Sequence, residues 1–88
     1  MVRKAIVFYG SVQGVGFRYR AYHAAEAFHC TGWVRNEYDG SVRMEIQGEE
    51  NAIDRVIMAI ESGTYVRIED MKVKSIPMVP DERGFTAD

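Results

Sequence analysis

The spacing of apolar residues changes twice over the first third of the chain, and each change predicts a new element. Ala5 to Tyr9 is apolar at every position and rich in β-branched and aromatic side chains, as is typical of a central strand covered on both faces. A glycine-rich stretch follows. Apolar residues then recur at helical spacing from about Phe17 to Phe28. The pattern predicts a strand, a loop and a helix in that order.

Two further strands are predicted on either side of a tight turn. Thr31 to Asn36 has strand character, and Asp39-Gly40 suits a hairpin turn because both residues tolerate a positive φ. From Val42 to Gln47 apolar and polar residues alternate strictly. The alternation predicts one buried and one solvated face, with Val42, Met44 and Ile46 facing the core and Arg43, Glu45 and Gln47 facing water.

A second helix is predicted from Glu49 or Glu50, whose carboxylates suit a helix N-terminus, to a stop at Gly63. Its apolar face consists of Ile53, Val56, Ile57 and Ile60. Beyond it, a single regular strand would flip its apolar face near Glu69-Asp70. We therefore expect a fourth strand over about Asp70 to Ile76, with Val66 to Ile68 leading into it.

The last stretch, Pro77 to Asp88, contains two prolines and several charges and is expected to be loop, with a brief edge strand around Phe85 as the alternative. The predicted order is β-α-β-β-α-β, which is the split pattern of a ferredoxin-like α+β sandwich. Two helices would cover one face of an antiparallel sheet. Residues 1–88 are expected to form a single domain.

Composition narrows the function classes. The 11 basic and 13 acidic residues give a net charge of −2, which argues against a nucleic-acid binder that works through bulk electrostatics. Cys30 is the only cysteine, so we expect no intrachain disulfide, no cysteine-based metal site and a reducing, cytoplasmic setting. The apolar run Ala5 to Tyr9 is too short for a membrane span or for the core of a signal peptide.

The stretch from Gly10 to Arg18, here called the glycine loop, carries the strongest functional signal. Its three glycines allow tight turns and bring backbone amides close to a ligand, and Arg18 falls where the helix begins. In the predicted topology the first two strands are parallel, so their carboxyl ends lie at one edge of the sheet. Asn36 should therefore face the glycine loop across an anion site.

These residues also resemble a known family. Val12 to Arg18, followed at a helix's length by Gly32-Trp33-Val34-Arg35-Asn36, is similar to the acylphosphatases. The resemblance implies a ferredoxin-like enzyme that hydrolyses small-molecule acyl phosphates to a carboxylate and inorganic phosphate without a metal or other cofactor. It implies that Arg18 binds the phosphate together with the backbone amides of Gln13, Gly14, Val15, Gly16 and Phe17, and that Asn36 positions the attacking water. Water would attack phosphorus in line, without a covalent phosphoenzyme.

The sequence departs from the family pattern at two places. His29 stands where the family commonly has the glycine that ends the first helix, and a histidine adopts the left-handed conformation at a higher energetic cost. The closing segment, Gly84 to Asp88, is shorter and less apolar than the family's usual final strand. The first departure affects stability, and the second leaves a fifth strand in doubt.

Other readings of these residues remain open. The same fold hosts modules that bind phosphate or RNA without catalysis, and such a module would need Arg18 and the glycine loop but no water-positioning Asn36. Arg35 should point to the opposite sheet face. His23 is expected to be a helix surface residue, and Cys30 a small buried one. We expect a monomer with no nucleic-acid partner and no membrane association.

Overall fold

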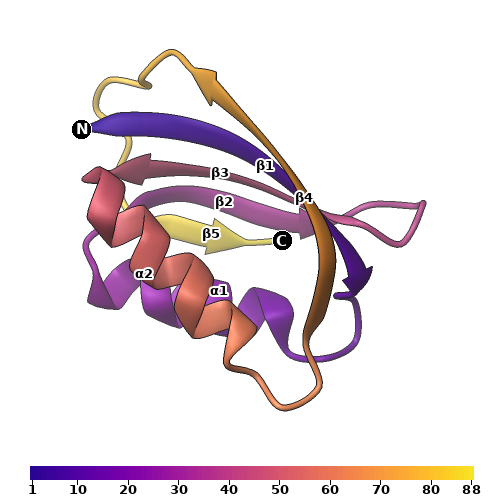
Figure 1. The fold of residues 1–88 in the computed structure, drawn as a ribbon. Coiled ribbons are helices and arrows are strands. Elements are labelled where there is room, and N and C mark those ends of the chain that lie inside the picture. The colour runs from indigo at the N-terminus through magenta and orange to yellow at the C-terminus, as the bar shows by residue number, and fades with distance from the viewer.

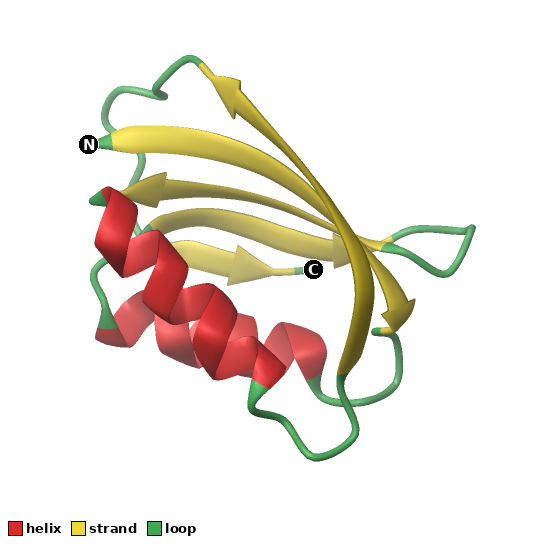
Figure 2. Cartoon of the chain, in the orientation of Figure 1, coloured by secondary structure: helices red, strands yellow, loops and turns green.

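The computed structural model describes residues 1–88 and shows two helices on one face of a five-stranded sheet (Figures 1 and 2). The ferredoxin-like order predicted from the sequence is confirmed. The helices and strands, in chain order, are β1 (Val2–Ser11), α1 (Phe17–Ala27), β2 (Thr31–Asn36), β3 (Val42–Gly48), α2 (Glu50–Glu61), β4 (Arg67–Ile76) and β5 (Phe85–Ala87).

The strands lie in the order β4-β1-β3-β2-β5. Both β1 and β2 pair antiparallel with β3, so they run parallel to each other and end at the same edge of the sheet (Figure 1). The four predicted strands make antiparallel pairs, as expected. The three-residue strand around Phe85 adds a parallel pair with β2, which makes the sheet mixed. The alternative of a brief edge strand is therefore the correct one.

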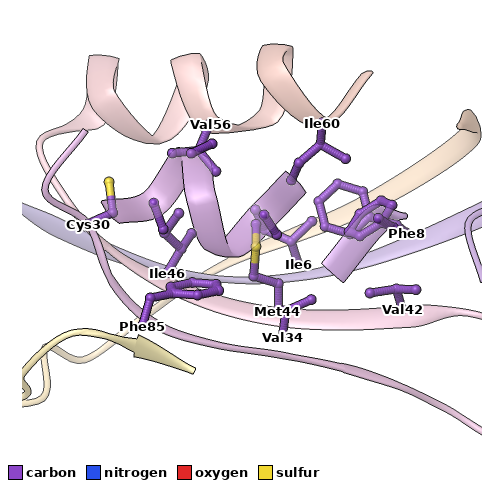
Figure 3. Close-up of a cluster of buried hydrophobic side chains, with 14 of the residues drawn as sticks. Ile6, Phe8, Cys30, Val34, Val42, Met44, Ile46, Val56, Ile60 and Phe85 are labelled. Atoms are coloured by element: carbon purple, nitrogen blue, oxygen red, sulfur yellow. The ribbon is translucent and has the colours of Figure 1, made fainter. Parts of the chain in front are cut away.

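The core lies between the sheet and the helices (Figure 3). Ile6 and Phe8 of β1 point into it and are fully buried, and Cys30 is buried at its margin. On the opposite face of β1, Ala5, Val7 and Tyr9 are only half-buried. The expectation that both faces of this strand are covered is thus wrong, because both helices pack on one side.

A β-bulge explains the change of apolar parity in the fourth strand. The register with β1 shifts between Tyr9 and Gly10, so that Tyr9 faces Asp70 and Gly10 faces Ile68, with Glu69 as the extra residue. Ile68 and Met71 can therefore both pack against the core although a regular strand would direct them to opposite faces. The strand runs unbroken from Arg67, where the sequence predicted a separate lead-in.

The prediction that Gln47 faces water is wrong. Its side chain is only 7% exposed, since its amide accepts a hydrogen bond from the Val79 amide (2.8 Å) and donates one to the Val79 carbonyl (3.1 Å). The buried Arg3 guanidinium lies beside it and pairs with Glu82 at 2.7 Å. Burial alone would raise the pKa of Glu82, but hydrogen bonds from Arg3 and Thr31 outweigh it and hold that pKa below its ordinary value. The segment after β4 thereby covers this end of the outer sheet face.

The ends of the helices differ in how they are made. α1 ends at Ala27, one residue before the predicted Phe28, and His29 adopts the left-handed conformation (φ 59°), as expected from its position. Gly63 follows α2 without a positive φ, so it is no left-handed cap. A Cβ at Gly63 would lie 2.6 Å from Nε of Arg20, so the side chain of Arg20 packs directly against this glycine.

Candidate functional site

The glycine loop leaves β1 and enters α1 with three glycines at positive φ, two of which, Gly14 and Gly16, lie just before the helix. Gly14 has φ 71° and Gly16 has φ 82°, while Val15 between them has negative φ. Such an alternation turns successive N–H groups toward one side and makes an anion-binding concavity, or nest. A Cβ at Gly14 or Gly16 would meet no atom within 4 Å. These glycines are therefore needed for the backbone conformation and not for space.

The backbone amides at the start of α1 have no acceptor within the protein. Gly16 is the N-cap and makes no side-chain capping bond, and the first helical hydrogen bond is donated by Arg20 to the Gly16 carbonyl. The N–H groups of residues 14–19 donate to no acceptor in the protein. Free N–H groups at a helix N-terminus, reinforced by the helix dipole, favour an anion.

Arg18 lies in the first turn of α1, with an exposed side chain. Its guanidinium donates a hydrogen bond to the backbone carbonyl of Asp88 and forms no ion pair with a carboxylate side chain. Its positive charge is therefore uncompensated by any acidic side chain. The guanidinium fork can bind two oxygens of one phosphoryl group.

Asn36 is the last residue of β2, and its side chain has no hydrogen-bond partner in the protein. The next residue, Glu37, would repel an anion, but its carboxylate pairs with Arg35 at 3.6 Å and with Arg43 at 3.4 Å. Arg35 points to the outer sheet face, where its guanidinium lies 4.9 Å from the centre of the Trp33 ring. The negative charge of Glu37 is thus largely neutralised.

Arg18 and Asn36 line one cavity of about 170 Å³, here called the loop pocket. Its other lining residues are Val12, Gly14, Gly16, Phe17 and Tyr19. The predicted site residues Gly14, Gly16 and Phe17 are therefore brought together with Arg18 and Asn36. Gln13 and Val15 do not line this pocket.

The side chain of Gln13 makes hydrogen bonds within the protein and does not line the loop pocket. Its amide nitrogen donates to the carbonyl oxygens of Glu37 (2.7 Å) and Ser41 (2.9 Å), which belong to the turn between β2 and β3. In the same turn the Asp39 carboxylate accepts hydrogen bonds from the hydroxyl and the amide of Ser41, and these bonds lower the pKa of Asp39. Gln13 therefore ties the glycine loop to the segment that follows Asn36.

Sequence reasoning missed two lining residues, Val12 and Tyr19. Val12 is 1% exposed and belongs to the core, so its position follows from the fold and not from a motif. Tyr19 is 69% exposed, although it lies in the first turn of a helix whose N-terminus is the candidate site. An exposed aromatic residue directly after Arg18 is the signal that could have identified it.

The remaining chemically active residues lie outside the loop pocket. His23 is one turn further along α1, with its ring 4.2 Å from the ring of Tyr19. Cys30 is buried, and its burial raises the thiol pKa, as is typical of an unreactive cysteine. No group of three or more potential metal-ligating side chains occurs in the structure. Neither helix is long and apolar enough to span a lipid bilayer.

Comparison with known proteins agrees with this geometry. The Acylphosphatase family model matches residues 4–87. Relatives named acylphosphatase include one from Geobacillus thermodenitrificans, 42% identical over 97% of this chain and 92% of its own length, and one from Clostridium acetobutylicum, 42% identical over 97% and 94%. The crystal structure of acylphosphatase from Bacillus subtilis superposes with a TM-score of 0.90 at 31% identity and covers 100% of this chain and 99% of its own. The chain belongs to the acylphosphatase family.

Proposed function

We propose that this protein hydrolyses acyl phosphates to a carboxylate and inorganic phosphate in the loop pocket. The observation that carries the proposal is that a guanidinium paired with no acidic side chain, unpartnered helix N-terminal amides and an unpartnered carboxamide line one small cavity. The acylphosphatase relatives supply the reaction type. Residues 1–88 act as a single catalytic domain in this proposal.

Arg18 and the backbone amides of the glycine loop, from Gln13 to Phe17, bind the phosphoryl group. In a loose phosphoryl-transfer transition state the negative charge is spread over the three equatorial oxygens. Two of these oxygens match the fork of Arg18, and the amides of the nest can donate to the third. These donors are held in place before the substrate arrives, so they stabilise the transition state without reorganisation.

Asn36 positions the nucleophile. Its carboxamide accepts a hydrogen bond from water through its oxygen and can donate one through its nitrogen, which fixes the direction of a water lone pair. In a loose transition state the attacking oxygen gains little positive charge until late, so orientation matters more than a strong base. The water attacks phosphorus in line with the departing carboxylate.

The leaving group needs little help. A carboxylate is stable as an anion at neutral pH, so it departs without a strong general acid. This requirement fits a pocket whose lining contains no histidine, aspartate or glutamate. We propose that the reaction is independent of metal ions and of other cofactors.

The decisive experiment measures benzoyl phosphate hydrolysis with and without a chelator, for wild type, Arg18→Gln and Asn36→Ala. Each substitution should lower kcat by about 10²–10³-fold, which is the usual effect of removing one donor that stabilises the transition state. Arg83→Gln and Asn51→Ala are matched controls, because both residues are exposed and lie outside the loop pocket; they should retain wild-type activity. Loss of activity on chelation would contradict the metal-free mechanism.

Inhibition by inorganic phosphate separates the two roles. Arg18→Gln should raise the inhibition constant for phosphate at least about tenfold, because it removes a charged pair of hydrogen bonds to the anion. Asn36→Ala should leave that constant within about twofold, since water and not phosphate is its partner. Folded variants that both keep full turnover would contradict the site assignment. Phosphate binding by the wild-type protein without any turnover would instead favour a non-catalytic binding module.

We also propose a cytoplasmic monomer that does not bind nucleic acid. The free, buried thiol of Cys30 suits a reducing compartment, and the net charge of −2 does not attract a polyanion. Sedimentation equilibrium should give the mass of one chain, 10.0 kDa. A concentration-independent mass of two chains would contradict the monomer.

A further inference from the structure

A second, larger cavity lies beside the loop pocket. It has a volume of about 580 Å³ and is an open groove along α1, closed on one side by Ala59 of α2; we call it the helix groove. Six of its nine lining residues are hydrophobic. The helix groove and the loop pocket share Gly16 and Tyr19 as lining residues, so the two cavities adjoin.

The two volumes suit two parts of one substrate. At about 170 Å³ the loop pocket is smaller than the roughly 300–1,000 Å³ of typical small-molecule sites, whereas the helix groove falls within that range. In an acyl phosphate the acyl carbon is bonded to an oxygen of the phosphoryl group. With the phosphoryl group on the amides of Gly16 and its neighbours, the acyl chain must begin within a few bonds of Tyr19.

The walls of the helix groove indicate what kind of acyl group fits. At the end near the loop pocket, the ring of Tyr19 packs against that of His23 with 4.2 Å between their centres and an angle of 55° between the ring planes. Beyond them, Ala24 and Ala59 leave space because their side chains are small. Flat aromatic walls beside a floor of methyl groups favour a flat, apolar ligand, since such a ligand buries area on both and can stack on the rings.

The one guanidinium in the helix groove does not change this conclusion. Nε of Arg20 lies close to Gly63, directly after the C-terminal end of α2. The backbone carbonyls at that end favour a positive charge, so Arg20 has a counterpart other than a bound anion. Its alkyl stem adds apolar surface to the groove.

We propose that the helix groove binds the acyl portion of the substrate through Tyr19 and His23, and that it selects aromatic acyl groups over short aliphatic ones. This inference rests on the proposed hydrolysis of acyl phosphates. An acetyl group is too short to pass Tyr19, so its hydrolysis depends on the loop pocket alone. A benzoyl group reaches the rings of Tyr19 and His23 and gains contact area there.

The test compares kcat/KM for benzoyl phosphate and acetyl phosphate in wild type, Tyr19→Ala and His23→Ala. The ratio of benzoyl to acetyl kcat/KM should fall about 3- to 10-fold in each variant, which is the size of one lost aromatic contact. Both side chains are exposed, so neither substitution removes core packing. Tyr22→Ala is the matched control, because Tyr22 also contacts His23, edge to face with 5.2 Å between the ring centres, but lines neither cavity; its ratio should equal that of wild type.

The outcomes distinguish this inference from the proposed function. If wild type hydrolyses neither substrate, the proposed function fails. If wild type hydrolyses both but the ratio is the same in Tyr19→Ala and His23→Ala, or falls equally in Tyr22→Ala, only the acyl site is wrong. A wild-type preference for succinyl over butyryl phosphate that Arg20→Gln abolishes would assign the helix groove to anionic acyl groups and overturn the proposal.

Discussion

Replacing Gln13 tests whether the glycine loop is held in place by the turn after β2. Gln13→Ala removes two hydrogen bonds, of 2.7 and 2.9 Å, to the carbonyls of Glu37 and Ser41. Each such bond contributes about 0.5–1.5 kcal/mol net. Both carbonyls keep another donor, since Gly40 donates to Glu37 and the Glu37 amide donates to Ser41, so neither is left without a partner. We therefore expect the lower part of the range, a loss of about 1–2 kcal/mol in the free energy of unfolding.

The assay is urea unfolding followed by the fluorescence of Trp33, the only tryptophan. With a slope near the low end for small proteins, about 1 kcal/mol per molar urea, the midpoint should fall by about 1–2 M. Gln13→Glu keeps the size but replaces the donor with a carboxylate that faces two carbonyl oxygens, so at pH 7 it should destabilise at least as strongly. Ser11→Ala, an exposed neighbour, is the control. An unchanged midpoint in Gln13→Ala, or a fully stable Gln13→Glu at pH 7, would refute the reasoning.

Three further predictions concern other parts of the structure. Cys30 should react with a thiol reagent at pH 8 only as fast as the protein unfolds, since burial raises its pKa and blocks access; rapid labelling of the native protein would contradict this. Arg3 holds the pKa of Glu82 below its ordinary value of 4.5. The pair therefore contributes its full stabilisation above about pH 4.5, and this contribution is lost as the pH falls through the lowered pKa. Unfolding measured from pH 7 to 3 should therefore show a steeper acid loss in wild type than in Glu82→Gln, and equal slopes would exclude the linkage. Gly32→Ala should prevent folding, because the new Cβ would lie 1.9 Å from a backbone oxygen of β3. In Gly40→Ala the new Cβ meets no atom within 4 Å, so this variant should lose only about 1–2 kcal/mol of stability through backbone strain at its positive φ. Thermal unfolding measures both variants, and similar stabilities would argue against the close approach at Gly32.

The sequence predicted the elements well where a single periodicity governed a segment. The alternation of Val42, Met44 and Ile46 and the helical spacing of Ile53, Val56 and Ile60 correspond to residues that are fully buried in the structure, and Ile57 on the same helix face is half-buried. Their burial depends on the face of one element, which the spacing alone determines. The proximity of Arg18 and Asn36 was also predictable, because β1 and β2 run parallel and end at the same edge of the sheet.

What the sequence could not predict depends on contacts between distant segments. Gln47 looks like a surface residue in its own strand and is buried only because Val79, 32 residues later, folds over it. The parity change near Glu69 indicated an irregularity, but only pairing with β1 makes it a bulge within one strand. The helix groove has no motif at all, since small residues from both helices create it.

The position of β3 between β1 and β2 has a consequence for folding kinetics. The glycine loop and Asn36 lie at the ends of β1 and β2, which do not pair with each other, and they come together only when both strands have paired with β3. Pairing of β1 with β3 joins residues up to 46 positions apart, for example Val2 with Gly48. Long-range pairing of this kind forms late and slowly compared with local structure. Recovery of catalytic activity during refolding should thus report sheet assembly and lag behind helix formation seen by circular dichroism.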